Sequence, residues 1–252
     1  MEDHNSKLKN FYVQFEEAMG QAKKRGTQEQ RIAESVRSHL RPVYRGDGEN
    51  LDLSSAMVFA EEIEQVDRWL ATANRVGHDR PNGNAEFSVF KAVLAYIWVA
   101  RCSGACHSTS AVMYMLMREK GLDPTLCVGE VGAGGKFFDH SWIEVGGAVF
   151  DAAVSIPLLR GSWVSAPIFA GIDLDRGNAT ELRYGAASGQ GFDKATQPAL
   201  ELDLSSYSAG AGKLSPFGLA HGLGGFCDVS ATMDSLRSKY GATRRVVRCV
   251  AA

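Results

Sequence analysis

The stretch Arg101–Ala111, RCSGACHSTSA, decides how the middle of this chain folds. It places Cys102 and Cys106 four positions apart with Gly104 between them, and a histidine follows the second cysteine directly. Three structures have this pattern: a metal-binding knuckle, a disulfide, and a nucleophile at the start of a helix. The sequence on either side distinguishes between them.

Helical periodicity runs through the sequence before this stretch. Apolar residues recur every third or fourth position in three series, which predict three amphipathic helices. The series are Phe11, Phe15 and Met19; Ile32, Val36 and Leu40; and Phe59, Ile63, Val66 and Leu70. Residues 87–100 are apolar on nearly every side but too few to span a bilayer, so they predict a buried helix.

The sequence after this stretch changes from helical to strand character. Residues 107–120, HSTSAVMYMLMREK, predict a buried central helix that ends at Gly121. The segments TLCVGEV, FDHSWIEV and AVFDAAV are short, rich in β-branched or aromatic residues, and separated by glycines. We therefore expect a central helix packed on an antiparallel sheet, with a helix at 233–240 and a strand at 245–250 near the end of the chain.

Adjacent glycines in Val145–Ala148, VGGA, predict a two-residue hairpin turn. If Val145 pairs with Ala148, Trp142 lies opposite Asp151 and His140 opposite Ala153, so that His140, Trp142 and Asp151 share one face. His140 and Asp151 would then be diagonal neighbours, with their Cα or Cβ atoms about 5–8 Å apart. A histidine and an aspartate on one face are two members of a catalytic triad that lacks its nucleophile.

Cys106 is the candidate nucleophile. The small residues before it allow a sharp turn, and a helix N-terminus favours a thiolate and supplies free N–H groups for an oxyanion. His140 would form the imidazolium that pairs with the thiolate, and Asp151 would orient it. Cys102 would lie at the end of the preceding helix, where the helix dipole disfavours a thiolate, and we interpret it as structural.

These motifs resemble the transglutaminase-like superfamily of papain-fold cysteine enzymes. GACHSTSAVMYMLMREKGLDPTLCVGEV is similar to that family's Gly-x-Cys helix and following strand, and DHSWIEVGGAVFDAAVS is similar to its histidine and aspartate strands. The resemblance covers about residues 100–155 and implies Cys106 as nucleophile, His140 as base and Asp151 as orienting acid. It also implies an α+β, papain-like fold. Ala152 and His107 stand where the family often has a proline and an aromatic residue.

Other interpretations of the same residues stay open. Cys102, Cys106 and His107 form a weak zinc motif without a fourth ligand, and the two cysteines could form a disulfide under oxidation. His107 is either a second catalytic histidine or an exposed helix residue. Trp142 either packs at the edge of the site or shields it from water, Gly104 shapes the turn, and Glu144 is expected to be solvated. Candidates for a side-chain oxyanion donor are Trp98, Tyr96, Asn82 and Asn84, while His221 is expected in a loop.

Composition and charge limit the classes of partner that the protein is expected to bind. The formal net charge of −2 and the lack of a basic block argue against nucleic acid, and we expect a soluble, cytoplasmic protein that does not bind membranes. Five cysteines without framework spacing predict free thiols. We expect a helical region at 1–100, the catalytic core at 101–155 and a Gly-rich region at 156–252 that borders the cleft, together in one compact domain. The oligomeric state is not readable from the sequence.

The predicted reaction is acyl transfer from a peptide or protein carboxamide through a thioester, without metal or organic cofactor. We expect a peptidase or an amidase/deamidase. The alternatives are an acyltransferase of the transglutaminase or N-acetyltransferase type with an amine acceptor, and an inactive peptide-binding module.

Overall fold

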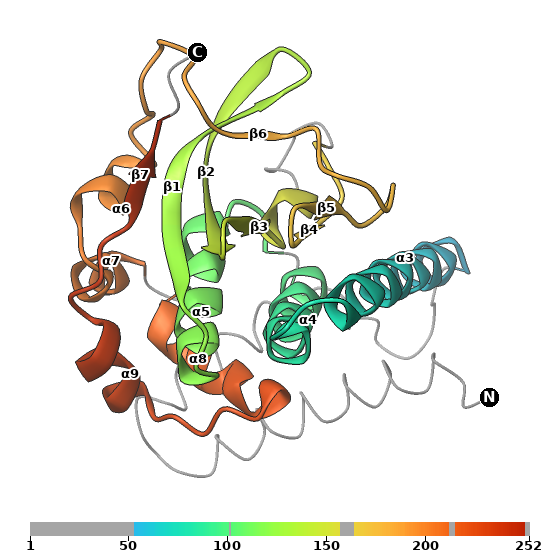
Figure 1. Cartoon of the computed structure of the whole chain (residues 1–252), viewed down its shortest axis with the longest axis horizontal. Coiled ribbons are helices and arrows are strands. Elements are labelled where there is room, and N and C mark those ends of the chain that lie inside the picture. The colour runs from blue at the N-terminus through green and yellow to red at the C-terminus, as the bar shows by residue number, and fades with distance from the viewer. Residues whose placement is uncertain (1–52, 101, 157–163, 212–214, 250–252) are drawn as a thin grey trace.

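A computed structural model describes residues 53–100, 102–156, 164–211 and 215–249 (Figure 1). The described residues form the expected α+β fold, in which helices pack on a curled, mainly antiparallel sheet. The two helices predicted around Phe11–Met19 and Ile32–Leu40 lie outside the described residues, as do the side chains of Phe59 and Ile63.

Two long helices precede the central one. Helix α3 spans Leu53–His78 and packs against α4, which spans Gly83–Val99. Helix α4 begins four residues earlier than the sequence predicts, because the N–H groups of Ala85 and Glu86 both donate to the Asn82 carbonyl. Almost every described side chain from residue 89 to 97 is buried, which confirms the prediction of a buried helix.

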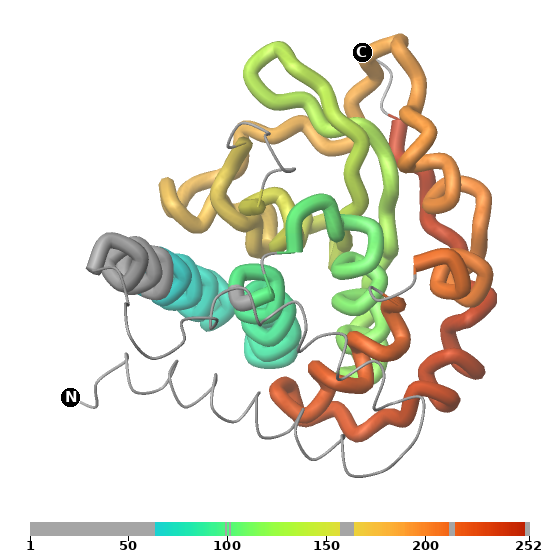
Figure 2. Tube along the Cα trace, turned by 180° about the vertical axis from the view of Figure 1, so that it is seen from behind, coloured from blue at the N-terminus to red at the C-terminus, as the bar shows by residue number. Residues whose placement is uncertain are grey.

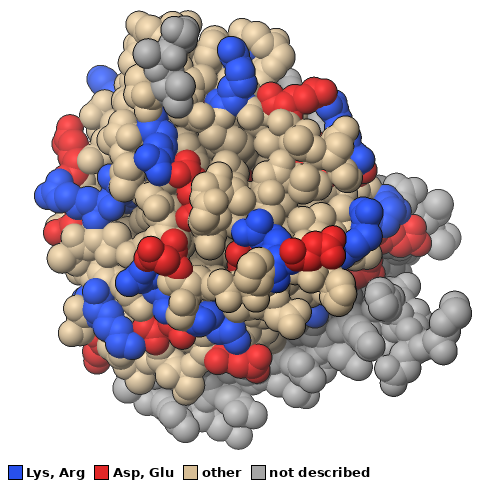
Figure 3. Space-filling model, in the orientation of Figure 1, with Lys and Arg blue, Asp and Glu red and all other residues tan. Residues whose placement is uncertain are grey.

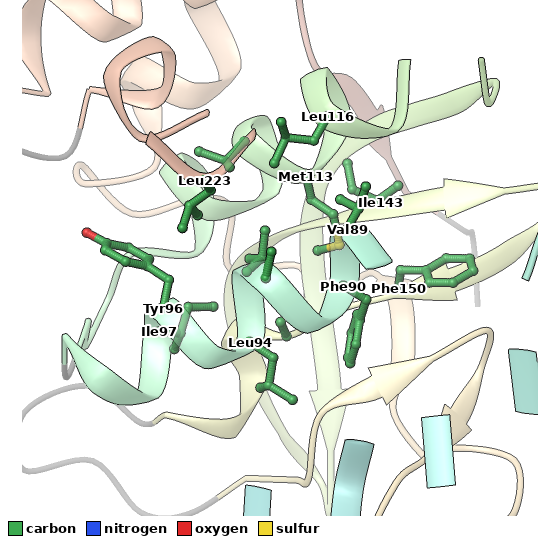
Figure 4. Packing of buried hydrophobic residues seen from close by; sticks show 14 of the residues in the cluster. Val89, Phe90, Leu94, Tyr96, Ile97, Met113, Leu116, Ile143, Phe150 and Leu223 are labelled. Carbon is green, nitrogen blue, oxygen red and sulfur yellow. The ribbon is translucent and has the colours of Figure 1, made fainter. Parts of the chain in front are cut away.

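The main hydrophobic core surrounds helix α5, Cys106–Glu119. One face of α5 packs on α4 and another on α8, Pro216–Gly224, while a third packs on the sheet. Figure 4 shows the meeting point: Met113 and Leu116 from α5 lie among side chains from α4, from α8 and from the sheet residues Ile143 and Phe150. A helix apolar on nearly every side is stable only when covered on nearly every side, as α5 is.

Strand β1, Pro124–Ala133, is the centre of the sheet. It pairs along its whole length with β2, Lys136–Val145, and β2 pairs with the short β3, Ala148–Phe150. The other edge of β1 is shared by two short strands, β6 at Arg183–Ala186 and β7 at Val246–Arg248. Strand β7 runs parallel to β1, whereas the other described pairings of this sheet are antiparallel.

The β2–β3 hairpin follows the predicted register for three pairs and then departs from it. Gly146 and Gly147 take the positive φ values of +58° and +80°, and Val145 pairs with Ala148 as predicted. The ladder stops at Phe150, so the expected pairs Trp142–Asp151 and His140–Ala153 do not form. The Asp151 carboxylate accepts the N–H groups two and three residues ahead, which turns the chain into a 3₁₀ helix at Ala153–Ser155.

The last third of the chain returns to the central sheet. After a small hairpin of β4 (Ile168–Phe169) and β5 (Ile172–Asp173), the chain forms β6. Helices α6 (Gln197–Glu201), α7 (Leu204–Gly210) and α9 (Met233–Tyr240) then lead to β7, and the predicted helix at 233–240 is confirmed. Figures 1 and 2 show α6, α7, α9 and β7 on one side of β1 and α5. Contacts of Tyr207 with Ser108 and of Arg245 with His107 join these elements to the first turn of α5.

Basic and acidic side chains are interspersed over the face shown in Figure 3. Among the described residues, no helix is both long and apolar enough to cross a membrane.

Candidate active site

Cys106 is the first residue of helix α5. The Cys102 N–H still donates to the Ile97 carbonyl at the end of α4, Gly104 then takes a φ of +69°, and α5 begins after Ala105. A side chain with a Cβ rarely adopts this φ, so glycine permits the reversal between the two helices. The structure thus has the predicted order of elements: one helix ends, small residues form a turn, and a new helix starts on Cys106.

The structure also brings His140 and Asp151 together. Nε2 of His140 on β2 lies 2.8 Å from Oδ2 of Asp151, and both side chains are buried. The Nε2–H bond does not point along the line to Oδ2, because Nε2 makes no aligned hydrogen bond. The contact is therefore a close ion pair, and poorly aligned hydrogen bonds of this kind are common in unliganded active sites.

Asp151 is fixed from three further directions. Its Oδ1 accepts the N–H groups of Ala153 and Val154, each at 3.1 Å, and its Oδ2 accepts the Tyr184 hydroxyl at 2.8 Å. Tyr184 lies on β6, and burial followed by the neighbouring Asp151 raises the pKa of its phenol well above the ordinary value. It therefore stays a hydrogen-bond donor at physiological pH. No local pattern marks Tyr184 as a site residue, because it is a single aromatic residue in a Gly-rich segment.

Electrostatics link Cys106 to the same imidazole. Burial would raise the pKa of the Cys106 thiol, but His140 and then His107 lower it well below its ordinary value through charge and hydrogen bonding. Burial would likewise lower the pKa of His140, but Asp151 and then Cys106 raise it well above the ordinary value. The shifts are opposite in sign, so the thiolate–imidazolium pair is favoured over the neutral thiol and imidazole.

His107 is half-buried and belongs to the same cluster, which corrects the expectation that it is merely exposed. Its Nδ1 is hydrogen-bonded to Oγ of Ser141 at 2.7 Å, and its ring contributes to lowering the pKa of Cys106. Ser141 lies next to His140 on β2, on the face that packs on α5. The start of α5 is thus attached to β2 beside the His140–Asp151 pair.

Trp142 is fully buried beneath the site. Its ring centroid lies 5.0 Å from that of Tyr184, and its Nε1 donates to the Glu144 carboxylate at 3.0 Å. Glu144 also pairs with Arg248, so the expectation of a merely solvated glutamate is wrong. Trp142 therefore contacts the site indirectly: its ring packs on Tyr184, and the hydroxyl of Tyr184 holds Asp151.

The alternative residues lie apart from this arrangement. Cys102 is buried, and burial raises the pKa of its thiol although a hydrogen bond with Tyr96 opposes the shift. All five cysteines are free thiols. Trp98 donates its indole N–H to Ser155 at 3.0 Å. His221 lies in helix α8, so the expectation that it lies in a loop is wrong, and its Nδ1 is hydrogen-bonded to the Ala231 carbonyl at 2.9 Å. Among the described residues, no three His, Cys, Asp or Glu side chains form a group that could hold a metal ion.

A family model matches the part of the chain that carries this site. Residues 53–157 match the model described as Transglutaminase-like superfamily, a segment that begins with α3 and ends two residues after the 3₁₀ helix that follows Asp151. The part of the chain that carries Cys106, His140 and Asp151 is therefore similar to this superfamily, as its motifs predict. This superfamily indicates the class of cysteine-dependent hydrolases and acyltransferases. Comparison with curated proteins and with solved structures gives no match.

Proposed function

We propose that this protein is a cysteine-dependent hydrolase that cleaves an amide bond through a thioester intermediate. Cys106 is the nucleophile, His140 carries the proton and Asp151 orients His140. The observation that supports this assignment is a single imidazole that lies 2.8 Å from a buried carboxylate and also lowers the pKa of a cysteine at a helix N-terminus.

Acylation begins from the ion pair. The Cys106 thiolate attacks the amide carbonyl carbon, and the carbonyl electrons move to oxygen. The N–H groups of Ser108 and Thr109 both donate to the Ala105 carbonyl, whereas the N–H of Cys106 precedes them and has no acceptor within the helix. This N–H is the backbone donor for the developing oxyanion. His140 then gives its proton to the amine nitrogen as the C–N bond breaks.

Deacylation reverses the role of His140. The neutral imidazole accepts a proton from water while the water oxygen attacks the thioester carbonyl, and the thiolate leaves as the carboxylic acid forms. Asp151 stabilises the imidazolium at both stages because two backbone N–H groups and the Tyr184 hydroxyl hold it in place. An amine in the place of water would give acyl transfer by the same steps.

A peptide or protein carboxamide is the proposed substrate class, and the chemistry uses no cofactor. Gly104 and Trp142 contribute to the shape of the site: Gly104 sets the direction in which α5 begins, and Trp142 supports Tyr184. Neither residue exchanges a proton in the proposed cycle.

The test is turnover on matched panels of peptides, glutamine-type carboxamides and amine acceptors. Wild type should turn over at least one panel, Cys106→Ala and His140→Ala should lose turnover to background, and Asp151→Asn should retain a small fraction. Cys249→Ser, at an exposed cysteine, is the matched control and should behave as wild type. Turnover by Cys106→Ala at the wild-type rate would contradict the assignment. Product formation only with an amine present would identify an acyltransferase.

A further inference from the structure

Arg245, directly before strand β7, is a buried cation beside the proposed nucleophile. Only 5% of the residue is exposed. No Asp or Glu carboxylate within the described residues lies within ion-pair distance of it, in contrast to Arg248, three residues further on, which pairs with Glu144. Buried charges are normally paired, so the missing partner of Arg245 requires an explanation.

Neutral groups hold the guanidinium of Arg245 against the first turn of α5. Its Nη2 donates to the His107 carbonyl at 2.8 Å, and Nη1 makes a long 3.5 Å contact with the Ala199 carbonyl. Its Cζ lies 4.4 Å from the centroid of the Tyr207 ring on α7, and the hydroxyl of that tyrosine is 3.3 Å from Oγ of Ser108. Nε of Arg245 is buried without a hydrogen-bond partner. None of these contacts neutralises the charge.

The position is unfavourable for a cation unless an anion is close. The N-terminus of a helix carries a partial positive charge, which repels a guanidinium. Burial lowers the pKa of Arg245, and the groups that oppose this effect are Tyr207 and Cys106. Burial also raises the pKa of Tyr207, which keeps its phenol neutral at physiological pH. The remaining group that can become an anion is the thiol of Cys106.

We propose that the guanidinium of Arg245 is the counter-ion of the Cys106 thiolate and acts as an electrostatic positioning residue for the nucleophile. This inference rests on the proposed function, because it assigns a further residue to the same site. The hydrogen bond to the His107 carbonyl holds the charge next to the nucleophile, and the Tyr207 ring covers the guanidinium face.

The assignment explains how the site remains neutral during the cycle. In the resting state the negative charges of Cys106 and Asp151 balance the positive charges of His140 and Arg245. After acylation Cys106 and His140 are both neutral, and Arg245 balances Asp151. Without Arg245 the buried site would carry one uncompensated negative charge at both stages, which would disfavour the thiolate.

The pH dependence of Cys106 reactivity tests this role. His140 on β2 and His107 on its own helix lower the pKa of Cys106, and Cys106 in turn raises the pKa values of Tyr207 on α7 and Arg245 before β7. Iodoacetamide labelling of Cys106, followed by peptide mass spectrometry across a pH series, gives the apparent pKa of the thiol. The chain variants are Arg245→Gln, Arg245→Lys and Arg244→Gln. Arg244 is exposed and also donates to a backbone carbonyl, so it is the matched control.

Removal of the charge should raise the apparent pKa of Cys106 by about one unit or more, and labelling below that pKa should slow roughly tenfold. Labelling at the alkaline plateau should change little, because the thiol itself is intact. Arg245→Lys should stay near the wild-type pKa, and Arg244→Gln should match wild type. If Arg245 had only a structural role, its substitutions would lower stability, but the apparent pKa of Cys106 would not differ between Arg245→Gln and Arg245→Lys.

The possible failures are distinguishable. A low apparent pKa in wild type that Arg245→Gln leaves unchanged overturns the counter-ion proposal and leaves the proposed function standing. An ordinary cysteine pKa in wild type overturns both. If Arg245→Gln does not fold by circular dichroism, Arg245→Lys decides the question, because a rise of one unit in that charge-conserving variant contradicts the proposal.

Discussion

Tyr184→Phe removes one oxygen from the site and leaves nearly the same volume. The lost group is the hydroxyl that donates to Oδ2 of Asp151 at 2.8 Å. Asp151 keeps two backbone donors on Oδ1, so the carboxylate should stay in place. Its Oδ2 would then face His140 alone, which strengthens the attraction for the imidazolium and weakens His140 as a proton donor.

The expected size follows from the kind of bond removed. A hydrogen bond to a buried charged group contributes about 1.5–3 kcal/mol, and no cavity forms to add to this cost. For a chain of this size each kcal/mol corresponds to roughly 2–4 °C in Tm, so the melting temperature should fall by roughly 3–12 °C. If about 1.4 kcal/mol of the change acts on the transition state, kcat/KM should fall about tenfold.

The assay pairs thermal unfolding with kcat/KM across pH, using Tyr240→Phe as the control. The Tyr240 hydroxyl also donates to a carboxylate, that of Glu119 at 2.6 Å. Glu119 ends α5, about 20 Å of helix away from Cys106 at about 1.5 Å per residue. Both variants should lose stability, but only Tyr184→Phe should lose kcat/KM and shift the alkaline limb to higher pH. Equal kcat/KM in the two variants would contradict a role for the Tyr184 hydroxyl in positioning Asp151.

Three further predictions concern the pH profile and two glycines. Turnover should be highest between the lowered pKa of Cys106 and the raised pKa of His140. It should fall in acid because the thiolate is protonated. It should fall in alkali because the imidazolium loses its proton, at a pH above the ordinary histidine pKa of about 6.5. Gly104→Ala, at a φ of +69°, should cost about 1–2 kcal/mol in urea unfolding and slow labelling of Cys106. Gly129→Ala would place a Cβ 2.5 Å from a backbone oxygen of β7 and should cost about 1–3 kcal/mol, whereas Gly210→Ala, with nothing within 4 Å, should be near neutral.

The central helix and the β2–β3 hairpin could be predicted from the sequence because interactions between residues close together in the chain determine both. The adjacent glycines 146 and 147 set the hairpin register, and the change from helical to strand periodicity after Gly121 separated α5 from the sheet. The predicted pairing failed after Phe150, where the Asp151 side chain competes for the backbone and ends the strand. The alternation of residues along a strand does not show that an aspartate side chain will bind the N–H groups that follow it, so the end of this strand could not be predicted from that alternation.

Residues brought to the site by long-range pairing could not be predicted in the same way. Tyr184 reaches Asp151 because β6 pairs with β1, and β6 is a four-residue strand whose pairing contains an irregularity at Glu130–Val131. Arg245 reaches the start of α5 because β7 joins β1 in parallel. The strand near 245–250 was predicted, but its partner was not, because parallel pairing between distant segments leaves no local pattern.

Alkylation at limiting iodoacetamide and mildly acidic pH shows which cysteine is the reactive thiolate, and the proposed function depends on that claim. The claim is that Cys106 is held as a thiolate by His140, while Cys102, Cys127 and Cys227 are buried thiols whose pKa is raised. The structure predicts one modification per chain, on Cys106 and ahead of the exposed Cys249, with this preference lost in His140→Ala. Preferential modification of Cys249, or a Cys106 rate that does not depend on His140, would contradict it.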